Sequence, residues 1–493
     1  MSKKEKKVQS KKVEETKKVT GKRKKSSISI TLLLIPILLG LVLAFPCYHI
    51  FQCLTTIPDT PQLDLDYWWG PNETKSKQNK DIRPYRIVFG DGMLHDLRMR
   101  FDSYRTETKK VKSLKDAAWT YGINSEAFSQ FFSNWIFQYK PEERVKFLNQ
   151  FDQFKTNIQG LDIHFIHVKP KVKKGVKVLP LLLLHGWPSS VREFYEAIPL
   201  LTTVRPGYDF VFEVIAPNLP GFVYSQGPVR PGLSPTKISI VIRNLMQRLG
   251  FKKYYIQGGD FGHSVGSGIA TLFPNEVLGF HTNFPANFDN KAYLAWILGA
   301  IWPTLVEKEY TDRLYPLAKK VEFFLEEFGY LHLQATKPDT IGIALQDSPP
   351  GLAAYILDRF MIFTDVNNKY TEDGGLSKHY NHTKLLDNIM LYWASGCITT
   401  SVRLYKESVG NSEFEQVIAK IPTPVPTWAL RLKHEIVFHP EFILKWKYPN
   451  FVGATTLDYG GHFAALELPE EFADDIFKAV KSFIGFTNKE KVF

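Results

Sequence analysis

The residues best suited to chemistry lie where an apolar strand pattern stops at two glycines and a helical pattern of small residues begins. Asp260 stands at this junction, between Gly259 and Phe261. Glycines in a sharp strand-to-helix turn permit the strained backbone that lifts a central side chain above a sheet. Asp260 is therefore predicted to be a nucleophile, although an Asp at a helix N-cap is also a common structural feature.

A serine alternative overlaps the same turn. Residues 262–266 (GHSVG) match the G-x-S-x-G pattern of serine hydrolases, with Ser264 at the centre. A nucleophile of this kind follows a strand directly, whereas the glycine-rich residues before Ser264 are poor strand formers. We therefore expect Ser264 one turn inside the helix and favour Asp260.

Two residues further along complete the chain order nucleophile, acid, histidine that is typical of α/β hydrolases. Glu435 follows a strand expected at 426–430, and His462 lies in a glycine-containing loop after the last expected strand. Glu441 and Asp458 are alternatives to Glu435. A histidine oriented by a carboxylate can act as a general base toward water.

Backbone donors and tyrosines can assist such a nucleophile. The HGWP stretch at 185–188 closes an expected strand where these folds place one N–H of an oxyanion hole, so Trp187 is predicted to supply one donor. The N–H of Phe261, the residue after the nucleophile, is predicted to supply the other. Tyr315 and Tyr405 lie in a helical region and are candidate side chains from above the site.

Alternating strand and helix patterns must position these residues. Strands are expected at 163–168, 178–184, 210–215 and 254–257, with helices at 191–201 and 239–249. This alternation predicts a largely parallel sheet covered by helices on both faces. Active sites of such sheets gather at the carboxyl ends of the strands, where the motifs above are found.

The composition predicts six successive parts. We expect a disordered Lys-rich tail (1–26), a transmembrane anchor (27–51), a strap that packs its aromatic side chains on the main domain (58–159), the first half of an α/β-hydrolase core (160–287), a helical cap (288–408) and the second half of the core (409–493). A cap excludes water and shapes an apolar pocket.

The net charge of +12 is concentrated at the N-terminus. Residues 1–25 contain 12 Lys or Arg and 3 Glu, which accounts for +9 of the +12. The remainder is nearly neutral and gives no sign of a folded basic groove, so no nucleic-acid partner is expected. Neither a metal nor another cofactor is predicted.

An uncharged apolar run follows the tail. Residues 28–45 are long enough to span a bilayer, and the basic region before them is longer than that of a cleaved signal peptide. We expect an uncleaved single-pass anchor. The Lys-rich tail should stay cytoplasmic, which would place the rest of the chain on the lumenal side. Sequons at Asn72 and Asn381 provide a test.

These motifs give the chain a family resemblance. It resembles microsomal epoxide hydrolases and the related juvenile-hormone epoxide hydrolases from the anchor to the C-terminus, in DYWWGP, GLDIHFIHVKP, HGWP, GGDFG, TKPDT, DSPPGLAAYI and YGGHFAA. The resemblance implies Asp260 as nucleophile, Glu435 and His462 as the charge pair, and Tyr315 and Tyr405 as the two cap tyrosines.

The sequence departs from the family pattern at two points, and the resemblance also implies a cellular location. Phe261 replaces the usual tryptophan of the family, which affects pocket shape, since only its backbone N–H is needed. The basic tail is the second departure. The family implies residence in the endoplasmic reticulum membrane with the catalytic domain facing the cytosol, opposite to what the charge rule predicts.

The expected chemistry agrees with this resemblance. An Asp nucleophile forms an ester whose acyl half belongs to the enzyme, so the substrate must offer an electrophilic saturated carbon. An epoxide does, and a neutral tyrosine can protonate its oxygen as the ring opens. We therefore expect hydration of apolar, lipid-like or xenobiotic epoxides to vicinal diols. The alternatives are a serine esterase using Ser264, a haloalkane dehalogenase, and a membrane-anchored lipid binder without turnover.

Overall fold

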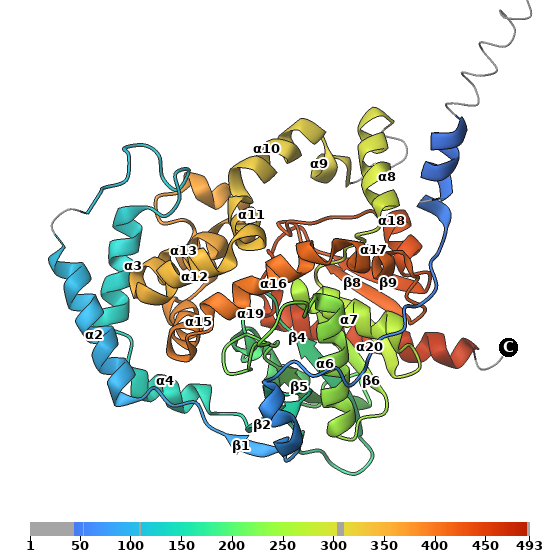
Figure 1. Ribbon diagram of the computed structural model, residues 1–493, viewed down its shortest axis with the longest axis horizontal. Helices are drawn as coiled ribbons and strands as arrows, with labels where there is room; N and C mark the ends of the chain where they lie inside the picture. Colours follow the sequence, from blue (N-terminus) through green and yellow to red (C-terminus); the bar gives the residue numbers. More distant parts are fainter. Residues whose placement is uncertain (1–43, 53, 108–109, 303–309, 491–493) are drawn as a thin grey trace, which may run out of the picture. The chain divides into compact units, whose positions relative to one another are not determined.

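The computed structural model describes residues 44–52, 54–107, 110–302 and 310–490 (Figure 1). The chain divides into two compact units, Met1–Thr56 and Ile57–Phe493. In the first unit, residues 44–52 and 54–55 are helical. The predicted tail and most of the predicted anchor lie outside the described residues. Across the described ranges, no helix combines the length and the apolar character that crossing a membrane would require.

A single sheet organises the second unit. Its nine described strands follow the order β1-β2-β3-β5-β4-β6-β7-β8-β9. Neighbours from β1 to β5 pair antiparallel, and neighbours from β5 to β9 pair parallel. The strands are β1 (Arg83–Tyr85), β2 (Gln153–Ile158), β3 (Leu161–Val168), β4 (Lys177–Leu184), β5 (Phe210–Pro217), β6 (Tyr254–Gly258), β7 (Val277–Thr282), β8 (Thr427–Arg431) and β9 (Phe451–Thr456). The expected, largely parallel sheet is confirmed.

Helices cover both faces of this sheet. In β7, a Cβ added at Gly279 would lie 2.2 Å from the ring of Phe483 in α20 (Pro469–Glu490). The next residue, Phe280, instead contacts α7 (Phe261–Leu272), where a Cβ at Gly266 would lie 2.9 Å from the Phe280 ring. Successive residues of a strand point to opposite faces. Helices α20 and α7 therefore lie on opposite faces. Helix α5 (Ala197–Leu201) packs with α20, and helix α6 (Pro235–Arg248) packs with α7.

The central strands end level with one another. Leu184 pairs with Gly258, and Gly258 pairs with Thr282, at the carboxyl ends of β4, β6 and β7. Residues 181–184 are buried, as suits a strand covered on both faces. The residues that directly follow β4, β6 and β7 are therefore close together at one edge of the sheet.

The region 58–159 does more than pack aromatic side chains. Trp69 and Trp135 are buried in the main core, but β1 and β2 also extend the sheet, which the sequence pattern did not indicate. Its helices are η1 (Asn72–Lys77), α2 (Asp91–Thr106), α3 (Ser125–Phe137) and α4 (Pro141–Leu148).

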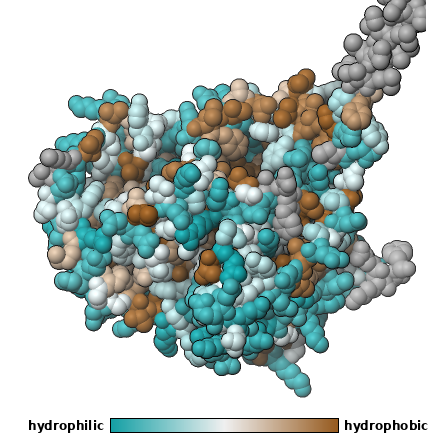
Figure 2. All heavy atoms as spheres, in the orientation of Figure 1, coloured by the Kyte–Doolittle hydropathy of each residue, from teal (hydrophilic) through white to brown (hydrophobic). Residues whose placement is uncertain are grey.

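A helical insertion separates β7 from β8. It comprises α8 (Asn290–Ile301), α9 (Thr311–Leu314), α10 (Leu317–Glu327), α11 (Gly329–Thr336), α12 (Pro338–Asp347), α13 (Pro349–Thr364), η5 (Val366–Tyr370), α14 (Leu376–His379), α15 (His382–Ser395), α16 (Ile398–Gly410) and α17 (Ser412–Lys420). Figure 2 shows apolar residues at the surface of α8 and α10, where Ile301 is 82% and Leu325 79% exposed. After β8 come α18 (Glu441–Lys447) and α19 (Ala464–Glu467).

Candidate active site

Asp260 occupies the turn between β6 and α7. Its φ of 50° and ψ of −126° are unusual for a residue with a side chain and are held only where the surroundings impose them. The glycines around it leave the necessary space, since a Cβ at Gly262 would lie 2.1 Å from the Leu184 oxygen and one at Gly186 2.2 Å from Asp260 Oδ1. The turn therefore sets the carboxylate directly against the loop that follows β4.

The two oxygens of this carboxylate meet different partners. The Trp187 N–H donates to Asp260 Oδ1 at 2.9 Å, while Oδ2 lies 3.6 Å from His462 Nε2. Oδ1 thus accepts a backbone hydrogen bond, as an oxyanion would, while Oδ2 faces the imidazole. Phe261 begins α7, where a backbone N–H has no partner within the helix. Its part as the second donor stays a prediction.

His462 is held between two carboxylates. Its Nδ1 lies 2.8 and 3.0 Å from the oxygens of Glu435, one of which also accepts from the Ile436 N–H at 2.7 Å. Burial alone would lower the pKa of His462, but the charges of Glu435 and Asp260 outweigh it and raise the pKa to about 10. The imidazole is therefore protonated in the resting enzyme at neutral pH.

The rival acids lie elsewhere. Glu441 pairs with Lys445 at 2.7 Å near the start of α18, and Asp458 is exposed. The structure brings Glu435, and neither of these, to His462. Ser264 lies inside α7, its N–H 3.3 Å from the Asp260 carbonyl oxygen, so it does not occupy the turn.

Neighbouring histidines have structural partners. His185 Nδ1 contacts the Gly186 oxygen at 2.9 Å, and its Nε2 accepts from the Leu219 N–H at 3.1 Å. His263 is placed between the hydroxyl groups of Thr282 and Tyr448. Burial lowers the pKa of His185 to about 4 and that of His263 to about 3. Both are neutral at physiological pH and belong to the core.

Tyr405 comes to the site from α16. Its buried ring makes edge contacts with Phe261 and Trp187, at centroid distances of 4.9 and 5.6 Å. Burial, followed by the neighbouring Tyr330 and the Asp260 charge, raises the pKa of Tyr405 well above its usual 10. The hydroxyl therefore keeps its proton at neutral pH.

Tyr315, the other expected cap tyrosine, is not brought to this group. Its hydroxyl donates to the Trp296 carbonyl oxygen at 2.8 Å. Its ring packs in a small cluster with Leu314 and Phe438, separate from the core that contains Tyr405. This corrects the prediction from the sequence. A series of short helical segments does not indicate which tyrosine faces the sheet.

Tyr330 lies in the place expected for Tyr315. Its ring stacks on Trp187 at 5.5 Å with an interplanar angle of 10° and lies 5.8 Å from the ring of Tyr405. Burial, and then the Asp260 charge, raises the pKa of Tyr330 above 10. The signal that could have found it is its position in α11, shortly before the TKPDT stretch that carried the resemblance.

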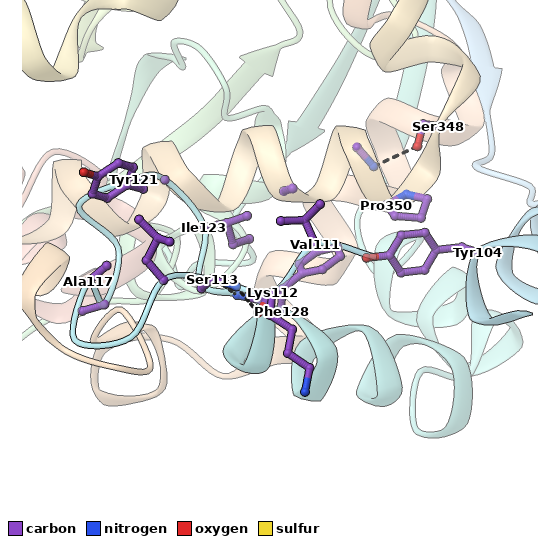
Figure 3. Close-up of a pocket in the computed structure, with 16 residues that line it drawn as sticks. Tyr104, Val111, Lys112, Ser113, Ala117, Tyr121, Ile123, Phe128, Ser348 and Pro350 are labelled. Atoms are coloured by element: carbon purple, nitrogen blue, oxygen red, sulfur yellow. Dashed lines mark hydrogen bonds between the residues drawn. The ribbon is translucent and has the colours of Figure 1, made fainter. Parts of the chain in front are cut away.

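A surface hollow lies apart from Asp260 and His462. It measures about 520 Å³ and lies between the α2–α3 connection and the start of α13 (Figure 3). Its serine hydroxyl groups bind the backbone: Ser113 and Ser125 exchange hydrogen bonds with each other's N–H groups at 2.8 and 3.0 Å, and Ser348 accepts from the Gly351 N–H at 3.0 Å. We assign no chemistry to this hollow.

Comparisons with known proteins extend over most of the chain. Residues 82–194 match the family described as epoxide hydrolase N terminus, and residues 180–323 match the alpha/beta hydrolase fold. The juvenile hormone epoxide hydrolase of Bombyx mori is 47% identical over 458 residues, which are 93% of this chain and 98% of that relative. Epoxide hydrolase 1 of Oryctolagus cuniculus is 40% identical over 435 residues, 86% and 93% of the two chains. The crystal structure of the silkworm enzyme matches with a TM-score of 0.84 and 48% identity, over 86% of this chain and all of that one.

Proposed function

Because this chain belongs to the epoxide hydrolase family, we propose that it hydrates epoxides in two steps through a covalent ester on Asp260. The observation that carries the proposal is the unequal setting of the Asp260 oxygens. Trp187 binds Oδ1 through its N–H, and His462 faces Oδ2.

In the first step, Asp260 Oδ2 attacks an epoxide carbon and the carbon–oxygen bond of the ring breaks. Tyr330 and Tyr405 are placed to donate a proton to the departing oxygen, because their raised pKa values keep both hydroxyl groups protonated. Esterification removes the Asp260 charge, one cause of the raised pKa of His462. His462 can then return a proton to the tyrosinate and become neutral.

In the second step, neutral His462 takes a proton from water, and the water oxygen bonds to Cγ of the ester. Trp187 N–H stabilises the negative charge that develops on Oδ1. The Cγ–O bond to the diol breaks, and the departing alkoxide takes the proton from His462. The new carboxylic acid of Asp260 then gives its proton to His462, which restores the resting state.

The test separates the two steps. The variant His462→Gln should form the ester on the peptide that contains Asp260, in a stoichiometric burst with little diol, and Asp260→Asn should form neither. In the wild type, one turnover in isotopically labelled water should label Asp260 and not the first diol. Label in that first diol would contradict the covalent mechanism. Ser264→Ala should retain most turnover, since Ser264 lies inside α7.

We further propose apolar substrates. The rings of Trp187, Phe261, Tyr330 and Tyr405 contact one another beside the nucleophile, and an aromatic wall binds apolar groups. One relative is named for juvenile hormone, so a juvenile hormone and simple aryl epoxides are the substrates to compare. A kcat/KM for small polar epoxides that equals the values for both would contradict the proposal of apolar substrates.

Residence in the endoplasmic reticulum membrane is also a proposal. It is supported by the uncharged apolar run 28–45 and by the exposed apolar surface of α8 and α10. Asn72 and Asn381 are exposed and can report orientation. A glycosidase-sensitive mass shift that disappears in Asn72→Gln and Asn381→Gln would place the catalytic unit in the lumen. Cleavage of an unglycosylated chain by protease added to intact, detergent-free microsomes would contradict that orientation.

A further inference from the structure

A small cavity borders the Asp260 carboxylate. Its volume is about 10 Å³, close to the space that one water molecule needs. Asp260, His462, Asn283, Ser189 and Glu193 contribute polar groups to its lining. A polar cavity of this size is a place where a single ordered water is expected. It adjoins the atom that water must attack in the second step.

Most polar groups around the cavity already have partners. Asn283 accepts from Gln257 at 2.7 Å through Oδ1 and donates to the His462 carbonyl oxygen at 3.2 Å through Nδ2. His462 Nδ1 is bonded to Glu435, so its Nε2 is the nitrogen that faces Asp260. Among the described residues of the lining, Glu193 is the one carboxyl group besides Asp260.

Glu193 is unusual for a carboxyl group. It lies in η2 (Val191–Phe194) and is 8% exposed. Burial raises the pKa of Glu193 to about 7, although the Ser189 hydroxyl and His462 act in the opposite direction. Burying a carboxyl group costs stability, so its place at this cavity calls for a chemical reason. Near neutral pH it can be ionised and accept a hydrogen bond.

We propose that Glu193 positions the water molecule that hydrolyses the Asp260 ester, an inference that rests on the covalent cycle proposed above. Neutral His462 Nε2 accepts one hydrogen of this water and Glu193 accepts the other, which directs an oxygen lone pair toward Cγ of Asp260. His462 takes the proton as the new O–Cγ bond forms and returns it to the diol oxygen as the old Cγ–O bond breaks. Glu193 undergoes no net change.

Single-turnover measurements of ester formation and ester decay test this assignment. Glu193→Gln keeps the shape of the side chain but turns part of the acceptor into a donor. Ester formation should stay within about twofold of wild type, because Asp260 and the tyrosines are untouched, while ester decay should slow by about 10- to 100-fold, the usual cost of misplacing a reacting group. Glu193→Asp, which keeps a carboxylate on a shorter stem, should recover part of the decay rate.

A nearby glutamate provides the matched control. Glu196 follows Glu193 in the chain and pairs with Arg192 at 2.8 Å, and it does not line the cavity. Glu196→Gln should leave both rates unchanged after allowance for any loss of thermal stability. Wild-type ester decay in Glu193→Gln, or an equal fall of both rates, would overturn the assignment and leave Glu193 a structural residue. Failure of His462→Gln to accumulate any ester would instead overturn the covalent cycle.

Discussion

At the scale of single residues, three cap tyrosines differ in the groups that surround their rings and hydroxyl groups. Tyr330 and Tyr405 lie against Trp187, and the Asp260 charge acts on both. The hydroxyl of Tyr315 is instead committed to the Trp296 carbonyl oxygen. A proton donor must reach the substrate oxygen beside Asp260, so the surroundings of the first two favour them over Tyr315 for the proposed role.

Phenylalanine substitutions should reproduce this ranking. Tyr330→Phe and Tyr405→Phe should each lower the rate of ester formation by roughly 10²-fold, the typical contribution of a general acid, and the double variant should lower it further. Tyr315→Phe should remain within about twofold, since its hydroxyl serves a helix contact. Rapid-quench measurement of the ester checks this. Strong loss in Tyr315→Phe with normal rates in Tyr330→Phe would reverse the assignment.

The sequence located some of these residues better than others. Asp260, Glu435 and His462 each follow a strand, and parallel strands end at one edge of a sheet, so chain order alone predicts that they lie together. The structure places them together. Among its described residues, the cap has no parallel strands whose ends would bring its side chains to one place. Which tyrosine faces Trp187 depends on how α11 and α16 pack, and no local pattern records that.

At the scale of elements, the close packing of α12 on α16 fixes the position of Tyr405. Gly342 of α12 lies against Thr399 of α16, and an added Cβ would lie 2.5 to 2.8 Å from the Thr399 side chain. A side chain there must push the two helices apart or turn Thr399. Either change moves the helix that carries Tyr405.

Gly342→Ala should therefore destabilise the cap by about 1–3 kcal/mol, the usual cost of overpacking, and should lower kcat more than a surface change does. Gly410→Ala, on α16 but with no heavy atom within 4 Å of the added Cβ, is the control and should be neutral. Thermal unfolding and steady-state kinetics measure both. Equal behaviour of the two variants would show that the α12–α16 contact does not position Tyr405.

Strands were easier to predict than the order in which they pair. Apolar runs at 178–184, 210–215 and 254–257 correspond to β4, β5 and β6, because buried strands are continuously apolar. The short strand β1 and the polar strand β2 carry no such signal. Strand β2 joins the sheet through a tight hairpin with β3, in which Ile158 pairs with Leu161. Strand β1 joins it by pairing with β2, a long-range contact that a local pattern does not contain.

At the scale of the whole molecule, the buried charges of the site make stability depend on pH. The folded protein raises the pKa of His462 to about 10, above the unfolded value of about 6.5. Its protonated form therefore stabilises the fold fully below about pH 6.5, and this contribution is lost as the pH rises toward 10.

The free energy of unfolding of the wild type should accordingly fall between pH 6.5 and 10, by an amount on the order of a few kcal/mol. Glu435→Gln removes the largest favourable charge acting on His462 and should flatten the dependence. Urea unfolding at several pH values gives the comparison. Parallel curves for the wild type and Glu435→Gln would show that His462 is not protonated in the resting fold.

Strand β1, the first of the sheet, affects how copies of the enzyme can pair with one another rather than the chemistry of the site. An outer strand offers unpaired N–H and C=O groups that can hydrogen bond to a neighbouring molecule. In the described sheet one of the two outer strands is β1, three residues long with Pro84 at its centre, and it covers the six-residue β2. Proline has no N–H to donate, so the border it forms is a poor template for another strand. The segment before the core thereby makes this border of the sheet a poor site for edge-to-edge pairing between crowded copies, and β9 forms the opposite border of the described sheet.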